Sequence, residues 1–484
     1  MSTIVVMFAA LRRLAKPELF FVACVAIFGT IILAITPPMQ TFDEQDHFFR
    51  AYQLSEGNLL PDLVSQGPGV KPDKAPGGVM PLNLLAFGYN FLYNIRLANN
   101  TGHEREALKK EFQAFKDRRI EPARTQAAYF PVAAAYSPVP YIPQIAAIYI
   151  GRVANTPILW FYYLGRVFNL VTWAVLIYIA IRLLPVGKWL MAVIVLLPPS
   201  LFQATTLSAD ALTNALAFLA VSLFAHYAFG RSKPVGKKDV AIIAAVVGSL
   251  ALCKPAFWPV AFLFWLLPRQ RYATTRQYVF GSAIITAITL VLFAVWFQLV
   301  KFTVPYMPLV NNPGELIDYQ QQLTYILHSP FSFLTALQHE PFAYLLTGIG
   351  ILGWREAPVG WFAGVLIPLL LAWGIVLVTI EKKNADYGWL QRLGSLGVLV
   401  GLVGMLLVSL YTTFTPLHAK TVNGLQSRYF IPYLAFCIPL LVGVAAKYKE
   451  RLRLGIVQRC APLVSVGVVT VLIMSVVALL RRYY

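Results

Sequence analysis

Acidic residues are scarce in this chain of 484 residues, which carries 21 Asp and Glu against 40 Lys and Arg. Only 13% of the residues are charged, whereas 58% are hydrophobic, and the mean hydropathy is +0.65. A soluble protein of this composition could not cover its surface with polar groups. The composition therefore excludes an ordinary soluble enzyme and predicts an integral membrane protein.

Cysteine is also rare. The four cysteines are Cys24, Cys253, Cys437 and Cys460, and each lies in or beside an apolar run without a CxxC or Cys/His spacing. Structural zinc sites have such spacings, so the pattern argues against one and predicts buried, unreactive thiols. Internal repeats and low-complexity tracts are lacking too, so we interpret residues 1–484 as a single integral membrane module.

Positive charge, by contrast, is abundant, and the net charge is +19. The cations gather at the ends of apolar runs, as expected for short cytoplasmic loops near anionic lipid headgroups, and this placement argues against a nucleic-acid partner. Six basic clusters are therefore predicted to face the cytoplasm. They are Arg12/Arg13/Lys16, Arg182/Lys188, Arg231/Lys233/Lys237/Lys238, Arg269/Arg271/Arg276, Lys382/Lys383/Arg392 and Lys447/Lys449/Arg451/Arg453/Arg459.

Apolar runs that approach the length needed to cross a bilayer, about 20 residues, recur along the chain. If the N-terminus is cytoplasmic, strict alternation of eleven spans places all six basic clusters inside. We therefore expect an all-α polytopic membrane protein with 11–13 transmembrane helices, the first a retained signal anchor. The candidate spans are 18–38, 158–181, 189–206, 210–229, 239–253, 255–268, 277–300, 358–380, 393–413, 427–446 and 460–480.

This topology leaves two large extracytoplasmic loops, 39–157 and 301–357. Residues 61–81 are rich in Pro and Gly and predict a loop. The apolar segment 136–153 is predicted to lie at the outer interface, because a single crossing there would reverse every later loop. A membrane hairpin that pairs it with 80–95 is the alternative that keeps the basic clusters inside.

Residues 104–119 predict an amphipathic helix in the first loop. Leu108, Phe112 and Phe115 recur with helical spacing on one face, and charged residues occupy the rest. Such a helix can rest on the bilayer surface.

Over half of the acids lie between residues 43 and 121, and the first group directly follows the first span. If this stretch is helical, Asp43, His47 and Arg50 share one face. Ionisable groups at the membrane edge are costly to hold near lipid, and a carboxylate there can act as a general base. We favour Asp43 for that role, with Glu44 as the alternative base. The competing interpretation is a solvated helix N-terminus whose acids complement the helix dipole.

Asp210 is the only acid between Glu121 and Asp239, and it lies between two apolar spans. An acid at the bilayer centre costs roughly 2.5–3.5 kcal/mol on insertion scales, so an acid near it is a functional candidate. The competing interpretation is a helix cap, in which Ser208 or Asp210 begins the next span.

Four cations lie on the predicted outer side, although Lys and Arg generally prefer cytoplasmic loops. They are Lys254, Arg355, Lys420 and Arg428. We predict that Lys254 and Arg428 bind an anionic group such as phosphate, with snorkelling to the interface as the alternative. Lys254-Pro255 also separates two short apolar segments, which predicts two helices that meet there. The scattered histidines do not supply the three or four ligands of a metal site, so none is predicted, although a divalent cation is compatible with the pattern.

Four ordered motifs resemble those of known membrane proteins. They are Asp43–Gly57, Tyr136–Gln144, Ala204–Leu212 and Gly424–Pro432. Together they are similar to a bacterial family of predicted membrane proteins with DExxHFxRAY and GxQxRYF motifs. Asp43-Glu44, Asp210 and Lys254-Pro255 further resemble the acid pair, the second acid and the Lys-Gly of C-type membrane glycosyltransferases, the protein mannosyltransferase and aminoarabinose transferase group.

The resemblance implies a C-type fold in the bacterial inner membrane and an inverting glycosyltransferase with no cofactor. Its donor would be a polyprenyl-phosphate sugar, and its acceptor a cell-envelope glycan, lipid or protein on the extracytoplasmic side. The expected catalytic residues are Asp43, Glu44 and Asp210, and the expected substrate-binding residues are His47, Arg50, Tyr136, Lys254, Gln426, Arg428 and Tyr429. A flippase or transporter, or a ligase or polymerase of lipid-linked glycans, is the alternative; the lack of repeats argues against a transporter.

Overall fold

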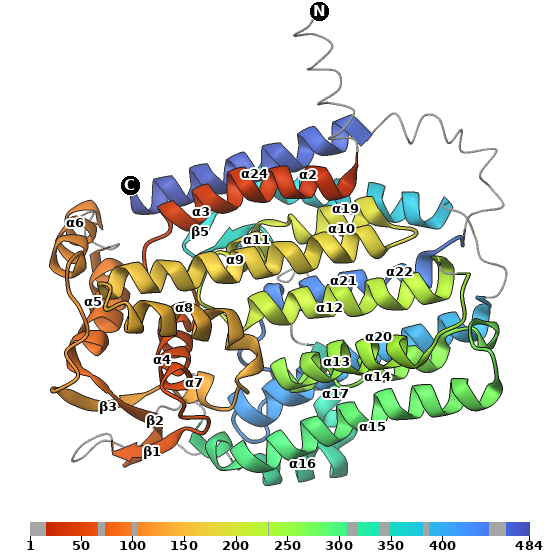
Figure 1. Ribbon diagram of the computed structural model, residues 1–484, viewed down its shortest axis with the longest axis horizontal. Helices are drawn as coiled ribbons and strands as arrows, with labels where there is room; N and C mark the ends of the chain where they lie inside the picture. The colour runs from red at the N-terminus through yellow and green to blue at the C-terminus, as the bar shows by residue number, and fades with distance from the viewer. Residues whose placement is uncertain are drawn as a thin grey trace, which may run out of the picture.

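Long apolar helices run side by side through the molecule, and short helices and strands gather at one end (Figure 1). The structure, a computed structural model, describes residues 16–65, 73–98, 104–230, 232–306, 318–338, 348–380, 387–444 and 461–484. Among these residues, seven helices are long and apolar enough to cross a bilayer, which confirms a mostly helical, polytopic membrane protein. They are α2 and α3 (Pro17–Cys24 and Thr30–Ile35, joined by a π-helical turn), α9 (Ile158–Leu183), α12 (Asp210–Ala225, continued to Gly230), α15 (Thr275–Val300), α19 (Trp361–Ile380), α20 (Trp389–Phe414) and α24 (Ala461–Tyr483).

The other four predicted spans are short or broken helices. Prolines break three of them, since proline lacks the N–H that would continue a helix and is favoured at helix starts. The segments are α10 (Lys188–Val195) with α11 (Pro198–Ala204), the 17-residue α13 (Lys237–Cys253), a run of helical turns around α14 (Val260–Leu263), and α21 (Ile431–Ala435) with α22 (Ile438–Leu441). Helix α13 ends immediately before Lys254 and a 3₁₀ turn begins at Pro255, so the predicted helix junction is confirmed.

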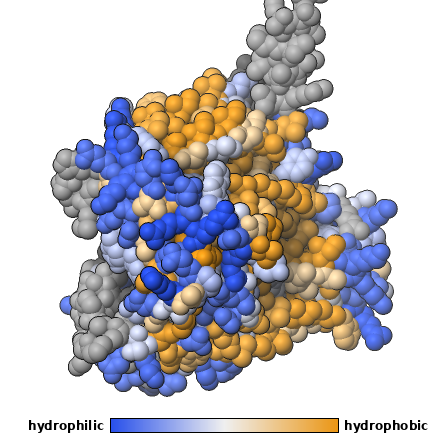
Figure 2. Space-filling model, turned by 60° about the vertical axis from the view of Figure 1, so that its left-hand side comes forward, coloured by the Kyte–Doolittle hydropathy of each residue, from blue (hydrophilic) through white to orange (hydrophobic). Residues whose placement is uncertain are grey.

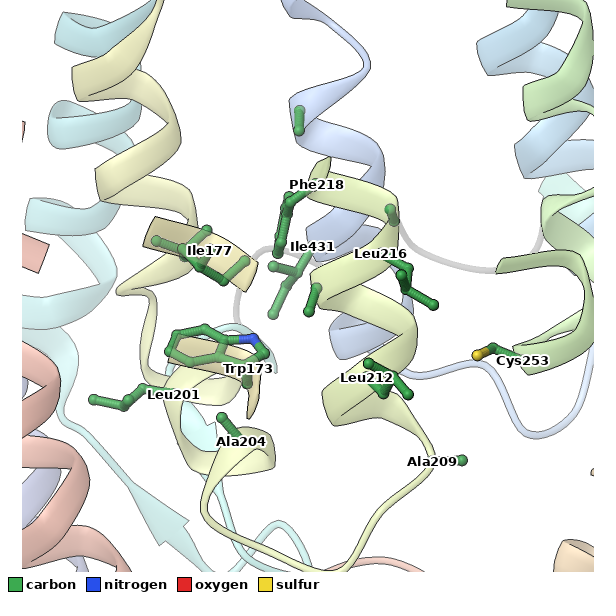
Figure 3. Packing of buried hydrophobic residues seen from close by; sticks show 14 of the residues in the cluster. Trp173, Ile177, Leu201, Ala204, Ala209, Leu212, Leu216, Phe218, Cys253 and Ile431 are labelled. Carbon is green, nitrogen blue, oxygen red and sulfur yellow. The ribbon is translucent and has the colours of Figure 1, made fainter. Parts of the chain in front are cut away.

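Helix α12 is the centre of the packing. Every residue from Asp210 to Ala225 is buried, as expected for a helix that is apolar on all sides. Around it lie Trp173 of α9, Leu201 of α11, Cys253 of α13 and Ile431 of α21 (Figure 3). Since α12 begins at Asp210, this packing fixes the depth and direction of the helix that carries the second predicted acid.

The apolar and polar surfaces of the molecule are separated. Helices α15, α19 and α20 expose large apolar side chains along their outer flanks, among them Val291, Leu369 and Val400. Figure 2 shows such an apolar flank beside a hydrophilic end. The arrangement suits a flank in contact with lipid and an end in contact with water.

The segment 39–157 forms most of the hydrophilic end. Its elements are α4 (Glu44–Ser55), β1 (Asp62–Ser65), β2 (Lys74–Pro81), α5 (Leu82–Ala98), α6 (Glu104–Phe115), β3 (Thr125–Tyr129), α7 (Pro131–Ala134) and α8 (Ile142–Val153). The strands form an antiparallel sheet in the order β1-β2-β3. The prediction of a loop over 61–81 is therefore wrong for residues 62–65 and 74–81, whereas 66–72 lie outside the described residues. Gly77 suits this sheet because a side chain there would overlap the carbonyl oxygen of Ala128.

Helix α6 confirms the amphipathic helix predicted in this segment. Its apolar face packs on α5, with Phe112 against Phe91 and Phe115 against Phe87, each at 5.4 Å between ring centroids. That face is thus covered by protein. The sequence suggested that this face could rest on a bilayer surface, but in the structure helix α5 buries it.

Helix α8 lies against α9 and is too short to cross a membrane alone. Its 12 residues rise about 18 Å, whereas a hydrocarbon core is about 30 Å thick. Ile150 and Val153 on its surface are exposed. The placement of 136–153 at the outer interface stays a prediction, as does the topology that depends on it.

The segment 301–357 is described at residues 301–306, 318–338 and 348–357. It contains α16 (Tyr319–His328), α17 (Pro330–Gln338), β4 (Ile351–Leu352) and part of a hairpin with β5 (Ala357–Pro358). Of the basic clusters, the one from Lys447 to Arg459 lies wholly outside the described residues, and so do Arg12, Arg13, Arg231, Lys382 and Lys383 of three others. The two small sheets correct the prediction of a purely α-helical fold.

Candidate functional site

Asp43 lies at the end of a turn that connects α3 with α4. The sequence predicted that Asp43 would share a helical face with His47 and Arg50, but α4 begins one residue later, at Glu44. Asp43 is instead the N-cap residue with φ 60°, and Met39 in the same turn has φ 62°. Left-handed backbone costs roughly 1–3 kcal/mol for a residue other than glycine. The Asp43 side chain makes no capping hydrogen bond, so its carboxylate is available for other contacts.

Asp210 opens α12 from the loop that follows α11. The Asp210 amide donates a hydrogen bond to Ser208 Oγ at 3.0 Å, so Ser208 supplies the local capping interaction. The Asp210 carboxylate instead accepts a hydrogen bond from Gln203 Nε2 at 3.1 Å. The side chain is therefore directed to tertiary partners and not to its own helix.

Two cations join the two acids. Arg428 Nη2 lies 3.9 Å from Asp43 Oδ2, and Arg428 Nη1 lies 3.8 Å from Asp210 Oδ2. Lys254 Nζ lies 3.3 Å from Asp210 Oδ1. Side chains from four distant segments thus converge, and their formal charges balance. The Asp210 and Arg428 side chains are only 11% and 12% exposed, so these interactions are weakly screened by solvent.

Aromatic rings hold the two cations in place. Lys254 Nζ lies 4.1 Å from the centroid of the Tyr429 ring, and Arg428 Cζ lies 5.3 Å from the same ring. Phe42 lies next to Asp43, and its ring centroid is also 5.3 Å from Arg428 Cζ. Such cation–π contacts are favoured where water is excluded. The predicted residue Tyr429 therefore shapes the cationic side of the site.

His47 and Tyr136 form a second layer beside the acids. His47 Nδ1 lies 2.6 Å from the hydroxyl of Tyr141, and the Tyr136 ring meets the His47 ring edge-on at 5.5 Å. Burial lowers the pKa of His47 to about 3, so the ring is neutral at pH 7. Burial also raises the pKa of Tyr136 to about 12. Both side chains therefore act as neutral hydrogen-bonding groups.

Burial also perturbs Asp43. Loss of solvation raises the pKa of Asp43 above its usual value, Arg428 opposes that rise, and the nearby Asp210 adds to it. A carboxylate with a raised pKa accepts a proton more readily than an ordinary aspartate does.

Glu44 and Arg50, which were both predicted as site residues, are occupied by structural contacts. Glu44 forms a fully buried ion pair with Arg166, in which both carboxylate oxygens accept hydrogen bonds at 3.0 Å. Arg50 donates to the carbonyl of Leu59 at 2.7 Å and to that of Tyr136 at 3.4 Å. Arg50 thus holds the backbone next to the Tyr136 ring.

A small pocket of about 60 Å³ opens beside Arg428. Gln426 and Arg428 both line it, and Gln426 Oε1 and Arg428 Nε are buried without a hydrogen-bond partner within the described part of the chain. Buried polar atoms normally have hydrogen-bond partners, and a bound ligand would supply partners for these two. The other lining residues are Thr41, Phe42, Pro199, Phe202, Gln203, Gly348, Ile351, Leu352, Gly353, Arg355 and Ser427.

Sequence reasoning missed three residues of this site: Phe42, Gln203 and Tyr141. Gln203 is a polar residue in an otherwise apolar stretch, and Tyr141 lies inside one of the quoted motifs, so both carried a signal. In the ranges that the structure describes, no group of three or more His, Cys, Asp or Glu side chains is arranged to hold a metal ion. Whether a divalent cation takes part stays a prediction.

The bundle of apolar helices defines a polytopic membrane protein, in which four charged side chains from distant segments converge. The chain belongs to the family described as "Predicted membrane protein (DUF2142)", whose profile matches residues 26–437. That range contains Asp43, Asp210, Lys254 and Arg428. No protein of curated function and no solved structure matches the chain.

Proposed function

We propose that this protein is an inverting membrane glycosyltransferase of the C-type. It transfers a sugar from a polyprenyl-phosphate donor to a cell-envelope glycan, lipid or protein acceptor. The observation that carries the proposal is the Arg428 guanidinium between Asp43 and Asp210, with Lys254 beside Asp210. A partly exposed base and a largely buried cradle for an anion thereby lie side by side, as transfer from a phosphate-linked sugar requires.

In the proposed reaction, the acceptor hydroxyl attacks the anomeric carbon as the bond between that carbon and the phosphate oxygen breaks. The hydroxyl proton passes to Asp43, whose pKa is raised by burial and whose carboxylate lies 3.9 Å from Arg428. A positioned base contributes typically 10²–10⁴-fold to the rate. The leaving phosphate takes the bonding electrons, and its charge is stabilised by Arg428 and Lys254.

The remaining residues orient the substrates. Asp210 holds Lys254 and Arg428 in place and contacts donor or acceptor. Gln426 offers the buried Oε1 as a hydrogen-bond acceptor for a sugar hydroxyl. His47 and Tyr136 line the approach to Asp43, and Tyr429 stacks under the cations. The pocket is small in this structure, so donor binding is expected to widen it.

We propose that the chain crosses the bacterial inner membrane eleven times, with the N-terminus in the cytoplasm and the site on the extracytoplasmic side. The seven long helices together with the four short or broken apolar segments would supply these crossings. The short segments would be buried among the longer helices, where irregular backbone is tolerated in a membrane.

The experiment compares purified wild-type protein with Asp43→Asn and Asp210→Asn in nanodiscs. Synthetic polyprenyl-phosphate hexoses and pentoses serve as donors and a cell-envelope extract supplies acceptors, with products identified by mass spectrometry. We expect transfer by the wild type and a loss of about 10²–10⁴-fold for Asp43→Asn. Asp62→Asn, an exposed acid on β1, is the matched control and should retain activity. Full activity in both site variants would refute the assignment.

The same preparation separates the rival functions. In sealed vesicles, a flippase would move the lipid-linked sugar across the bilayer without making a product. A ligase or polymerase would transfer a preassembled glycan and leave the single-sugar donors unused.

A further inference from the structure

The turn from Thr36 to Asp43 is held by hydrogen bonds from distant parts of the chain. Arg166 donates to the carbonyls of Thr36 at 2.6 Å and of Pro37 at 3.0 Å. The Met39 amide donates to the Tyr162 hydroxyl at 3.2 Å, and the Met39 carbonyl accepts from Trp354 Nε1 at 3.2 Å. These partners come from α9 and from the β4–β5 hairpin. Tertiary contacts therefore hold the shape of this turn.

The Glu44–Arg166 ion pair anchors the end of this turn. Both side chains are fully buried, and the arginine uses its planar fork to contact both carboxylate oxygens. Arg166 thus binds the carbonyls at the start of the turn and the residue that follows Asp43 at its end. The same side chain also packs against the Tyr162 ring, with Cζ 4.8 Å from the centroid.

Glu44 also reaches the second acid-bearing segment. Its Oε1 accepts a hydrogen bond from the amide of Leu207 at 2.9 Å. Leu207 lies three residues before Asp210, whereas Glu44 directly follows Asp43. One carboxylate therefore fixes the backbone beside both proposed functional acids.

We propose that Glu44 and Arg166 are a positioning pair that sets the separation of Asp43 and Asp210 around Arg428. This inference rests on the proposed function, because it assigns the pair to the geometry of that site. Replacing a buried ion pair with apolar residues is often neutral or stabilising. Fold stability alone therefore does not explain why this chain has the Glu44–Arg166 pair. A base, in contrast, must be placed accurately, since a displacement of about 1 Å can cost about 10²-fold in rate. Asp43, with its left-handed backbone, lies between the carbonyls that Arg166 binds and Glu44.

The experiment uses the full chain in nanodiscs with the variant Arg166→Lys. Lysine keeps the positive charge but cannot reproduce the bidentate contact together with the two carbonyl contacts. We expect kcat to fall about 10- to 10²-fold with little change in the donor KM. The affinity for farnesyl phosphate tests whether Lys254 and Arg428 still bind a phosphate. It should stay near the wild-type value. The acid limb of the pH–rate profile should move to lower pH, since a released Asp43 gains solvation.

The matched control is Arg152→Lys. Arg152 also pairs with a glutamate, Glu56, at 3.0 Å and lies over a tyrosine ring, but it contacts neither the turn nor the site. It should leave kcat and the pH–rate profile unchanged. If Arg166→Lys fails to fold, Tyr162→Phe deletes the oxygen that accepts from the Met39 amide and also contacts Glu44, with the exposed Tyr149→Phe as its control. The expected kcat loss is then smaller and in the same direction.

The outcomes separate this inference from the function on which it rests. A wild-type protein that transfers no sugar overturns the proposed function, and the positioning role with it. Wild-type transfer together with folded Arg166→Lys or Tyr162→Phe protein at the wild-type kcat overturns the positioning role alone. A loss of kcat accompanied by an equal loss of farnesyl phosphate binding also overturns it, because the damage then extends to the phosphate cradle.

Discussion

Arg428→Gln removes the group that contacts both proposed functional acids. Arg428 lies 3.9 Å from Asp43 and 3.8 Å from Asp210, with its side chain largely buried. At such distances and an effective dielectric constant of about 20, each pair carries ~4 kcal/mol of Coulomb energy before desolvation offsets it. Without Arg428, the two carboxylates repel each other with only Lys254 to balance them. Both the protonation of Asp43 and the stabilisation of the leaving phosphate should change.

The sign of the pH effect follows from the environment of Asp43. Burial raises the pKa of Asp43 and Arg428 opposes that rise. Loss of Arg428 therefore raises this pKa further. A base acts when it is deprotonated, so activity is present above the pKa and is lost as the pH falls through it. We expect the acid limb of the pH–rate profile to move to higher pH in Arg428→Gln.

The expected size of the rate effect comes from the leaving group. Removing one preorganised donor from a developing anion typically costs about 10²–10³-fold in kcat. Arg428→Lys should lie between the wild type and Arg428→Gln, because one ammonium cannot contact both carboxylates in a planar fork. Steady-state transfer assays in nanodiscs across the pH range provide both quantities.

The control is Lys420→Gln, which removes one exposed positive charge from another turn. An acid limb that stays in place or moves to lower pH in Arg428→Gln would refute the electrostatic reasoning. A kcat equal to that of Lys420→Gln would refute the role of Arg428 in binding the phosphate.

Three further predictions follow from single contacts. His47→Gln should leave the pH–rate profile unchanged between about pH 5 and 8, because the pKa of His47 is about 3 and the ring is already neutral. Lys254→Gln should lower kcat by about 10²-fold and Lys254→Arg by less, because Nζ lies 3.3 Å from Asp210 and arginine keeps the charge. Gly77→Ala should reduce the free energy of unfolding by about 1–3 kcal/mol, measured by thermal melting, because its Cβ would overlap the Ala128 carbonyl.

Each of these predictions has a contradicting result. A titration near neutral pH that disappears in His47→Gln would show that the ring is charged in the wild type. Full activity of Lys254→Gln would remove this lysine from the phosphate cradle. For the glycine, the comparison is Gly78→Ala, whose Cβ would meet only the flexible end of the Gln53 side chain. Equal melting temperatures for the two alanine variants would contradict the steric argument.

Local signals in the sequence predicted a good part of this molecule. Apolar runs located the seven long helices, the spacing of Leu108, Phe112 and Phe115 located α6, and Lys254-Pro255 located a helix junction. Each of these depends on neighbouring residues alone. Sheet β1-β2-β3 was missed because the register of β2 is set by Ala128 and its neighbours on β3, while Pro and Gly in β2 suggested a loop.

For the candidate site, too, the sequence identified single residues, whereas their contacts depend on distant parts of the chain. Composition singled out Asp43, Asp210, Lys254 and Arg428 because each is a charged residue in an unfavourable place. The structure brings these four together, yet their pairing could not be read from spacing, since Asp43 and Arg428 are far apart in the chain. Phe42 was overlooked because an aromatic residue beside an apolar span carries no signal of its own.

Glu44 shows why adjacent acids cannot be assigned roles from sequence. Asp43 and Glu44 are identical in charge and neighbours in the chain, and the preference for Asp43 followed from a shared helical face with His47 and Arg50 that α4 does not provide. The left-handed backbone at Asp43 and the start of α4 turn the two carboxylates to different partners, Arg428 for one and Arg166 for the other. Arg166 is supplied by α9, far along the chain, and it fully occupies Glu44. Both carboxylate oxygens of Glu44 accept hydrogen bonds from Arg166, so Asp43 is the acid that we propose as the base.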